Sequence, residues 1–143
     1  MEQHFKGFNI RVYALCVVDN QILTITESFA NKIITKMPGG GLEFGEGIVD
    51  CLKREFKEEL NLDILVEEPF YIQENFVNSL ANDQKQLVVL YFKATILNIH
   101  QLKILEPKIK QVQWLSILDK NPFSLPLDQI VFNKLQQKII KKM

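Results

Sequence analysis

Three glutamates at helical spacing are the residues in this sequence that most clearly suggest chemistry. Glu55, Glu58 and Glu59 share one side of a helix predicted over residues 47–60, where apolar residues recur every three or four positions. Such neighbours repel one another, at a cost of about 0.2–0.5 kcal/mol per exposed pair. The cluster therefore indicates either a function that compensates the repulsion or an ordinary charged surface.

A divalent cation would compensate these acids. Mg²⁺ prefers carboxylate oxygens, keeps several waters and often completes its shell with phosphate oxygens of a substrate. The alternative is a salt-bridged surface, because Arg54 and Glu58 stand four positions apart and can pair. The predicted helix alone does not decide between the two.

A glycine-rich segment directly before this helix favours the cation. Five of the six glycines lie within residues 39–47, in a chain otherwise poor in glycine. Glycine is suited to positive φ and to close approach of the backbone to another group. A flexible linker is not expected between a strand-like run and a strongly patterned helix. The segment therefore predicts a specialised loop that adjoins the acids.

Loop and helix together resemble the Nudix box, G-x5-E-x7-R-E-U-x-E-E-x-G-U, over residues 40–62. The spacing agrees throughout, and every acidic and basic position is filled. Two positions depart: Phe56 replaces an aliphatic residue, and Asn61 replaces a glycine. Asparagine also tolerates the left-handed conformation that ends a helix, so the fold is expected to persist.

The resemblance implies an α+β fold, with a mixed β-sheet sandwiched between helices (α/β/α), in a single domain over residues 1–143. It also implies a Mg²⁺-dependent pyrophosphohydrolase, with Mn²⁺ as an alternative ion. The substrate would be a nucleoside diphosphate linked to another moiety, such as a nucleotide sugar, an ADP-ribose-like compound or a nucleoside triphosphate. Water would attack a phosphorus. The competing hypothesis is a non-catalytic nucleotide-sensing module, in which we expect eroded glutamates, whereas this box is complete.

The metal ligands implied by the resemblance are Glu55 and Glu59. Glu58 follows as a further ligand or as the base that activates water, and Gly39 would offer its backbone carbonyl. Arg54 is expected to orient a glutamate.

A further catalytic glutamate often follows the box in similar proteins. Between Glu74 and Glu106 the only acid is Asp83. Glu106 is therefore the best candidate, with a plain surface acid as an equal alternative. The identity of the general base stays open.

Residues from the loop and from the preceding strands are candidates for substrate contact. Arg11, Phe29 and Lys36 precede the loop and could contact base, ribose or phosphate. The loop adds Gly40, Gly41 and Glu46, of which Glu46 would also partner the metal shell or Arg54.

Composition excludes several other classes of protein. The 17 Lys and Arg residues balance the 17 Asp and Glu residues in 143 positions, and 47% of residues are hydrophobic. Neither a disordered chain nor a polycation for a nucleic-acid polymer fits these values. No apolar run reaches the roughly 20 residues of a membrane helix, no export signal is evident, and two isolated cysteines form no disulfide framework. We expect a cytoplasmic protein that binds a small nucleotide, and the family resemblance suggests a homodimer.

The remaining elements are predicted from hydrophobic patterning. Strands are expected over residues 8–18, 22–26, 33–37, 62–77, 87–99 and 109–115, with a hairpin turn at Asp19 and Asn20. A C-terminal helix is expected behind Pro126. The apolar stripe of the first helix is predicted to comprise Ile48, Val49, Leu52, Phe56 and Leu60, and that of the second Leu127, Ile130, Val131, Leu135, Ile139 and Ile140.

Overall fold

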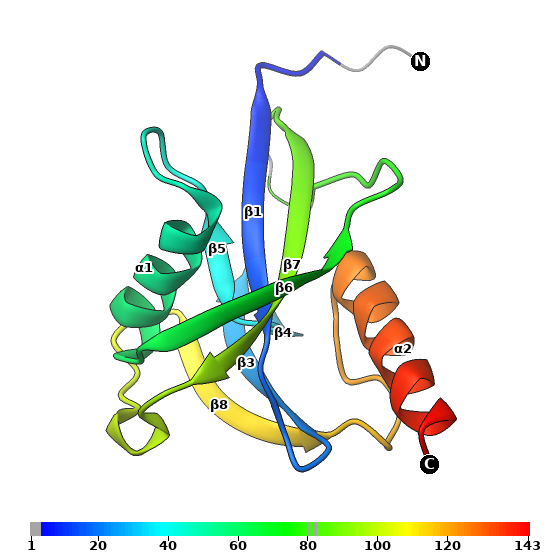
Figure 1. Ribbon diagram of the computed structural model, residues 1–143. Helices are drawn as coiled ribbons and strands as arrows, with labels where there is room; N and C mark the ends of the chain where they lie inside the picture. The colour runs from blue at the N-terminus through cyan, green and yellow to red at the C-terminus, as the bar shows by residue number, and fades with distance from the viewer. Residues whose placement is uncertain (1–3, 80, 82) are drawn as a thin grey trace.

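Two four-stranded sheets lie between two helices (Figure 1). The computed structural model describes residues 4–79, 81 and 83–143, and the helices and strands below are those of this part of the chain. Helix α1 covers one side of the strands and α2 the other. The helices are α1 (Ile48–Leu60) and α2 (Pro126–Lys141), with a short 3₁₀ turn η1 (Ile99–Gln101).

The first sheet is mixed and the second is antiparallel. In the first, of order β5-β1-β7-β6, β1 and β7 are parallel and the other pairs are antiparallel. In the second, β3 pairs with β2, β4 and β8. The strand bounds are β1 (Phe8–Leu15), β2 (Val17–Val18), β3 (Gln21–Phe29), β4 (Lys32–Lys36), β5 (Gly39–Gly41), β6 (Ile64–Ile72), β7 (Gln86–Ile96) and β8 (Ile109–Ser116).

The predicted fold class is confirmed, but the glycine segment expected to be a loop begins with a strand, because Gly39–Gly41 pair with β1 as β5. The run expected over residues 8–18 is split at Cys16, because β1 belongs to the first sheet while β2 turns into the second. Asp19 and Asn20 form the expected hairpin turn, both with positive φ. The strands expected over 62–77 and 87–99 are β6 and β7, with shifted ends. That residues 1–143 form a single domain stays a prediction.

Alternation along β1 divides the core into two clusters. Val12 and Ala14 face the α1 side, whereas Tyr13 and Leu15 face the α2 side. The α1 cluster includes Cys51, Leu52, Phe56 and Leu60, and the α2 cluster includes Leu127, Val131, Phe132 and Leu135.

Part of each predicted apolar stripe is wrong. Val49 is 43% exposed in the first turn of α1, and Cys51 is fully buried instead. On α2, Ile130 and Ile140 are exposed, because the buried face runs through Asp128 and Phe132. The buried face of α2 therefore differs from the predicted one and includes the acid Asp128.

Asn61 ends α1 as expected. Its φ of 58° and ψ of 35° are left-handed, its N–H donates to the Lys57 carbonyl, and the N–H of Leu62 donates to the Phe56 carbonyl. Asparagine thus replaces the expected glycine without loss of the cap. In the described part of the chain, neither helix has the length and apolar character needed to cross a membrane.

We expect Phe56→Ala to lower the free energy of unfolding by about 3–5 kcal/mol, because this side chain fills the core under α1 and its removal leaves a cavity. Val49→Ala, on the same helix but exposed, should cost less than about 1 kcal/mol. Urea unfolding of both variants measures this. Equal losses would contradict the assigned buried face of α1.

Candidate active site

Gly40 brings the backbone of β5 against the Glu55 carboxylate. A Cβ placed on Gly40 would lie 2.3 Å from the Glu55 carboxyl carbon and from one carboxyl oxygen. Real side chains do not tolerate that distance, so the Glu55 side chain occupies the space that a larger residue would fill. The glycine-rich segment therefore adjoins the acids directly, as the sequence predicts.

Gly39 lies equally close to β1. A Cβ there would lie 2.1 Å from the Val12 carbonyl oxygen, and its φ of +146° is strained for other residues. Only glycine fits at this position of β5. The role of its carbonyl as a metal ligand stays a prediction.

Arg54 is the cation at the centre of the acidic face. Its guanidinium donates to both carboxylate oxygens of Glu46 at 2.9 and 2.7 Å and to Glu55 at 2.8 Å. It reaches Glu58 at 3.2 Å, and the Gly41 carbonyl oxygen accepts from it at 3.0 Å. One arginine thus ties the loop to two glutamates of α1, and its orienting role stays a prediction.

Glu46 is fixed by this pairing. Hydrogen bonds from Arg54 lower the pKa of Glu46 to about 2, with help from the backbone N–H of Glu43. Glu43 itself lies 3.6 Å from Arg54 and is exposed. Glu46 therefore partners Arg54, which was one of the two roles expected for it.

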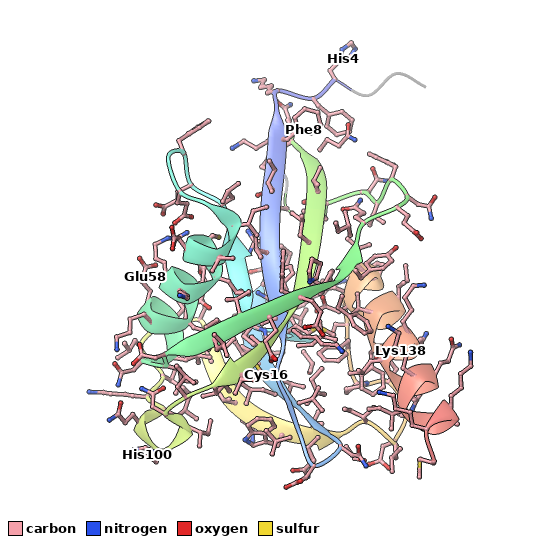
Figure 2. All side chains as sticks on the ribbon, in the orientation of Figure 1. His4, Phe8, Cys16, Glu58, His100 and Lys138 are labelled. Atoms are coloured by element: carbon pink, nitrogen blue, oxygen red, sulfur yellow. The ribbon has the colours of Figure 1, made fainter. Side chains whose placement is uncertain are left out.

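Glu59 does not share the pairing with Arg54 that fixes Glu46, and it lies beside the acid Glu55. Burial raises the pKa of Glu59 to about 8, Lys36 opposes this rise, and the neighbouring Glu55 carboxylate adds to it. Glu58, by contrast, is 59% exposed and lies on the outer side of α1 (Figure 2). Of the three glutamates, Glu55 and Glu59 are thus the two that are withdrawn from water next to the loop.

The donor set suits a hard cation. In the described residues no three His, Cys, Asp or Glu side chains are grouped so that they could hold a metal ion, and Arg54 binds Glu55 and Glu58. Glu55 and Glu59 nevertheless supply adjacent oxygen ligands whose repulsion a divalent ion would relieve. The residues fit such an ion, provided that the contacts of Arg54 rearrange.

A pocket lies between the two sheets and the start of α2, and its cations Arg11 and Lys36 interact electrostatically with Glu55 and Glu59 respectively. Arg11, Phe29 and Lys36, the three predicted substrate contacts, all line it. It holds about 130 Å³. Comparable cavities of about 150 Å³ accommodate one aromatic ring.

Glu27 is a site residue that sequence analysis missed. Its carboxylate lies 3.3 Å from the Lys36 ammonium, and both side chains are largely buried. Lys36 also lies over the Tyr13 ring, 4.7 Å from its centre. Burial opposes the charge of Lys36, but Tyr13 and Glu27 more than offset it, so the pKa of Lys36 is raised.

Asp128 and Tyr91 were also missed. Both line the pocket, and the Tyr91 hydroxyl donates to Asp128. The backbone N–H of Met37 donates to the second carboxylate oxygen at 3.2 Å. Burial raises the pKa of Asp128 to about 6, against the hydrogen bond from Tyr91 and the charge of Lys36. The sequence signal that could have identified Asp128 is an aspartate among the apolar residues of α2.

Glu106 is placed near α1 but not among the acids. The Leu105 N–H donates to the Glu59 carbonyl oxygen at 2.8 Å, so the segment before β8 follows the end of α1. The Glu106 carboxylate accepts from the Lys108 N–H at 3.3 Å. Its catalytic role stays a prediction, as does the alternative of a surface acid.

Cys51 is a core residue. It is fully buried, and its thiol lies 3.5 Å from the Gly41 carbonyl oxygen. Burial raises the pKa of Cys51 to about 12, and Glu46 adds to the rise. The thiol therefore stays protonated.

A family model described as the NUDIX domain matches residues 7–133. The chain belongs to the Nudix hydrolase family. The match includes the box, both sheets and the first half of α2. A search of curated proteins found no match.

Solved structures of Nudix proteins share this fold. A NUDIX hydrolase from Nitrosomonas europaea is 22% identical, with a TM-score of 0.76 over 92% of this chain and 90% of that one. A MutT NUDIX hydrolase from Burkholderia pseudomallei is 19% identical, with a TM-score of 0.72 over 91% and 98%. An ADP-ribose pyrophosphatase from Streptococcus suis is 17% identical, with a TM-score of 0.63 over 90% and 92%. At these identities the likeness shows the fold alone.

The raised pKa of Asp128 makes this residue a source of pH-dependent stability. The folded-state pKa of about 6 lies above the ordinary value near 4. The contribution of Asp128 to the free energy of unfolding is therefore full below about pH 4 and is lost as pH rises through 6. Asp128→Asn, which keeps an acceptor for Met37, should gain stability over the unchanged protein between pH 4 and 7, on the order of 2–3 kcal/mol. Urea unfolding across this range measures the difference.

Asp119→Asn is the control, because Asp119 is exposed. Its free energy of unfolding should differ little from that of the unchanged protein at every pH measured, because the substituted side chain is exposed. A difference for Asp128→Asn that stays constant, or changes in the other direction, would contradict the burial of a strained carboxyl group.

Proposed function

We propose that this protein is a Mg²⁺-dependent pyrophosphohydrolase that cleaves a nucleoside diphosphate linked to another moiety. Mn²⁺ would be an alternative ion. The observation that carries the proposal is the Glu55 carboxylate seated against Gly40 with the partly buried Glu59 beside it. Two repelling acids against the mostly buried backbone of β5, with Arg11 and Lys36 of the pocket in electrostatic interaction with Glu55 and Glu59, suit an ion-bridged diphosphate.

Glu55 and Glu59 would hold the ion, with Glu58 and the Gly39 carbonyl as further ligands. When bound, a divalent ion neutralises phosphate oxygens and lowers the pKa of water. The water oxygen would bond to one phosphorus. The bond between that phosphorus and the bridging oxygen would break, and the leaving phosphate would keep the bridging oxygen.

The protein's own side chains orient the reactants. Arg54 holds Glu46 at the loop and also binds Glu55, and the contact with Glu55 would rearrange when the ion binds. Arg11 and Lys36 supply positive charge at the pocket, where the diphosphate would lie. Either Glu58 or Glu106 would accept the proton of the attacking water.

The cation contacts of the pocket also argue for an anionic ligand. Arg11 is largely buried. Burial opposes its charge, but Tyr13 and Glu55 offset this, so the pKa of Arg11 is raised. Two cations held charged in one pocket suit an anionic ligand. The small nucleotide, the homodimer and the cytoplasmic location named above remain part of this proposal.

We expect Glu59→Gln to lower Mg²⁺-dependent turnover by at least about 100-fold, because it removes a charged ligand oxygen. The assay measures products from ADP-ribose, nucleotide sugars and nucleoside triphosphates. Mg²⁺ should also raise the melting temperature of the unchanged protein, and less so that of the variant. Glu74→Gln, at an exposed site, is the matched control. Unchanged turnover in Glu59→Gln would refute the proposal, and binding without turnover in the unchanged protein would indicate the sensing module.

Gly40→Ala is a second, independent test. Its methyl group would displace the Glu55 carboxylate, so we expect the Mg²⁺ concentration for half-maximal activity to rise more than tenfold (about 10–100-fold for loss of ligand placement). Gly41→Ala places its Cβ 3.6 Å from the nearest side-chain atom, an ordinary contact, and should change it less than about threefold. Equal effects of the two alanines would show that the close approach of Glu55 is not needed.

A further inference from the structure

We propose that a basic groove between β6 and α2 binds a linear oligophosphate, at a second site that is separate from the candidate active site. The groove is lined by residues 69–74, at the end of β6 and directly after it, and by Lys134, Gln137, Lys138 and Lys141 of α2. None of these residues lines the pocket between the two sheets.

The groove lies away from the acidic face of α1. Figure 2 shows Lys138 on α2 and Glu58 on α1, at opposite sides of the molecule. An anion attracted to the lysines of the groove is therefore kept apart from the repelling carboxylates. This separation makes the groove a site of its own.

Three lysines form one row along the groove. Lys134, Lys138 and Lys141 stand at positions i, i+4 and i+7, which lie on one face of a helix. Like charges at such spacing repel one another. Among the residues that the structure describes, none of the three ammonium groups forms an ion pair with an acid. One acid, Glu74, lines the groove, so positive charge prevails there.

Aromatic rings beneath the row hold two of these lysines in place. The Lys138 ammonium lies 4.9 Å from the centre of the Phe70 ring, and the Lys134 ammonium lies 5.6 Å from the centre of the Tyr71 ring. Such contacts are favourable and restrict the long lysine side chains. Part of the side-chain entropy that an ion pair costs is thus lost before an anion binds.

The same contacts favour a bare phosphate chain over other anionic partners. Lys134 and Lys138 lie over the two rings, so little ring surface remains for the bases of a single-stranded nucleic acid or the apolar side chains of a peptide. The lysines line a groove of about 710 Å³, whereas a lipid surface suits a flat or convex face. A narrow chain that carries charge along its whole length fits this groove.

A phosphate chain also matches the row of lysines in length. At a rise of 1.5 Å per residue, Lys134 and Lys141 are about 10 Å apart along α2. Phosphate oxygens accept charge-assisted hydrogen bonds from ammonium groups, and each further phosphate reaches further along the row. Inorganic polyphosphate and the phosphate tail of a nucleoside tetraphosphate both present such a chain.

The test is calorimetric binding to the full chain, with a chelator present so that no divalent ion bridges phosphate to the acids of α1. Affinity should rise from orthophosphate through diphosphate to tetraphosphate, with tetraphosphate at least about tenfold tighter than diphosphate. Adenosine tetraphosphate distinguishes the two sources of the chain. Equal affinity would indicate the inorganic chain, and a gain that depends on Lys138 would indicate the nucleotide; both support the site.

Lys138→Gln should weaken the binding of tetraphosphate on the order of fivefold, and a further Lys134→Gln should weaken it again. Lys138→Arg, which keeps the charge, should retain it. Lys53→Gln is the matched control, because it removes the same charge from an exposed position of α1, and it should change the affinity less than about twofold. The substituted lysines are exposed, so the fold is expected to persist in each variant.

No binding of tetraphosphate, an affinity that is independent of chain length, or equal losses in Lys53→Gln and Lys138→Gln would overturn the assignment. Tighter binding of octauridylate, of hexaglutamate, or of vesicles of phosphatidylserine and phosphatidylcholine in equal parts, each lost in Lys138→Gln, would overturn it too. The groove would then belong to a nucleic acid, an acidic peptide or a membrane. Turnover is not measured, so a failure of the proposed function does not affect this result.

Discussion

Repulsion among carboxylates on one face of α1 is the constraint on which the site depends. Arg54 offsets part of it, because its guanidinium binds Glu46, Glu55 and Glu58. Glu59 is left next to Glu55, partly buried, with a pKa raised to about 8. Arg54 binds only Glu55 of this pair, and Lys36 offsets the rise in the pKa of Glu59 only in part. An ion held between the helix and the glycine segment would supply further positive charge.

The rest of the fold keeps the acids and the pocket in contact. Gly39 and Gly40 allow β5 to lie against β1 and Glu55 at distances that no side chain permits. Alternation along β1 places Tyr13 on the α2 side, where Lys36 lies over its ring. The hairpin of β3 and β4 sets Glu27 beside Lys36. Arg11 and Lys36 of the pocket thus interact electrostatically with Glu55 and Glu59 of the helix.

Local sequence determines the box but not its surroundings. The spacing of glycines and acids predicts the loop, α1 and the cap at Asn61, because each depends on neighbours along the chain. Glu27 and Asp128 were missed because strand pairing and helix rotation bring them to the site from distant positions. The pairing of Ile25 with Lys36 places Glu27 diagonally across the hairpin, a relation that requires the register. Val49 was misassigned because a helical wheel does not show where the sheet begins to cover the helix.

Diffraction from a crystal grown with Mn²⁺, recorded at the anomalous scattering edge of manganese, tests the central claim most directly. The account predicts a peak bound by carboxylate oxygens of both Glu55 and Glu59, beside the glycine segment, with the contact between Arg54 and Glu55 rearranged. A Glu55–Glu59 pair that remains without a metal ion at saturating Mn²⁺, or a peak elsewhere with every contact of Arg54 retained, would contradict it.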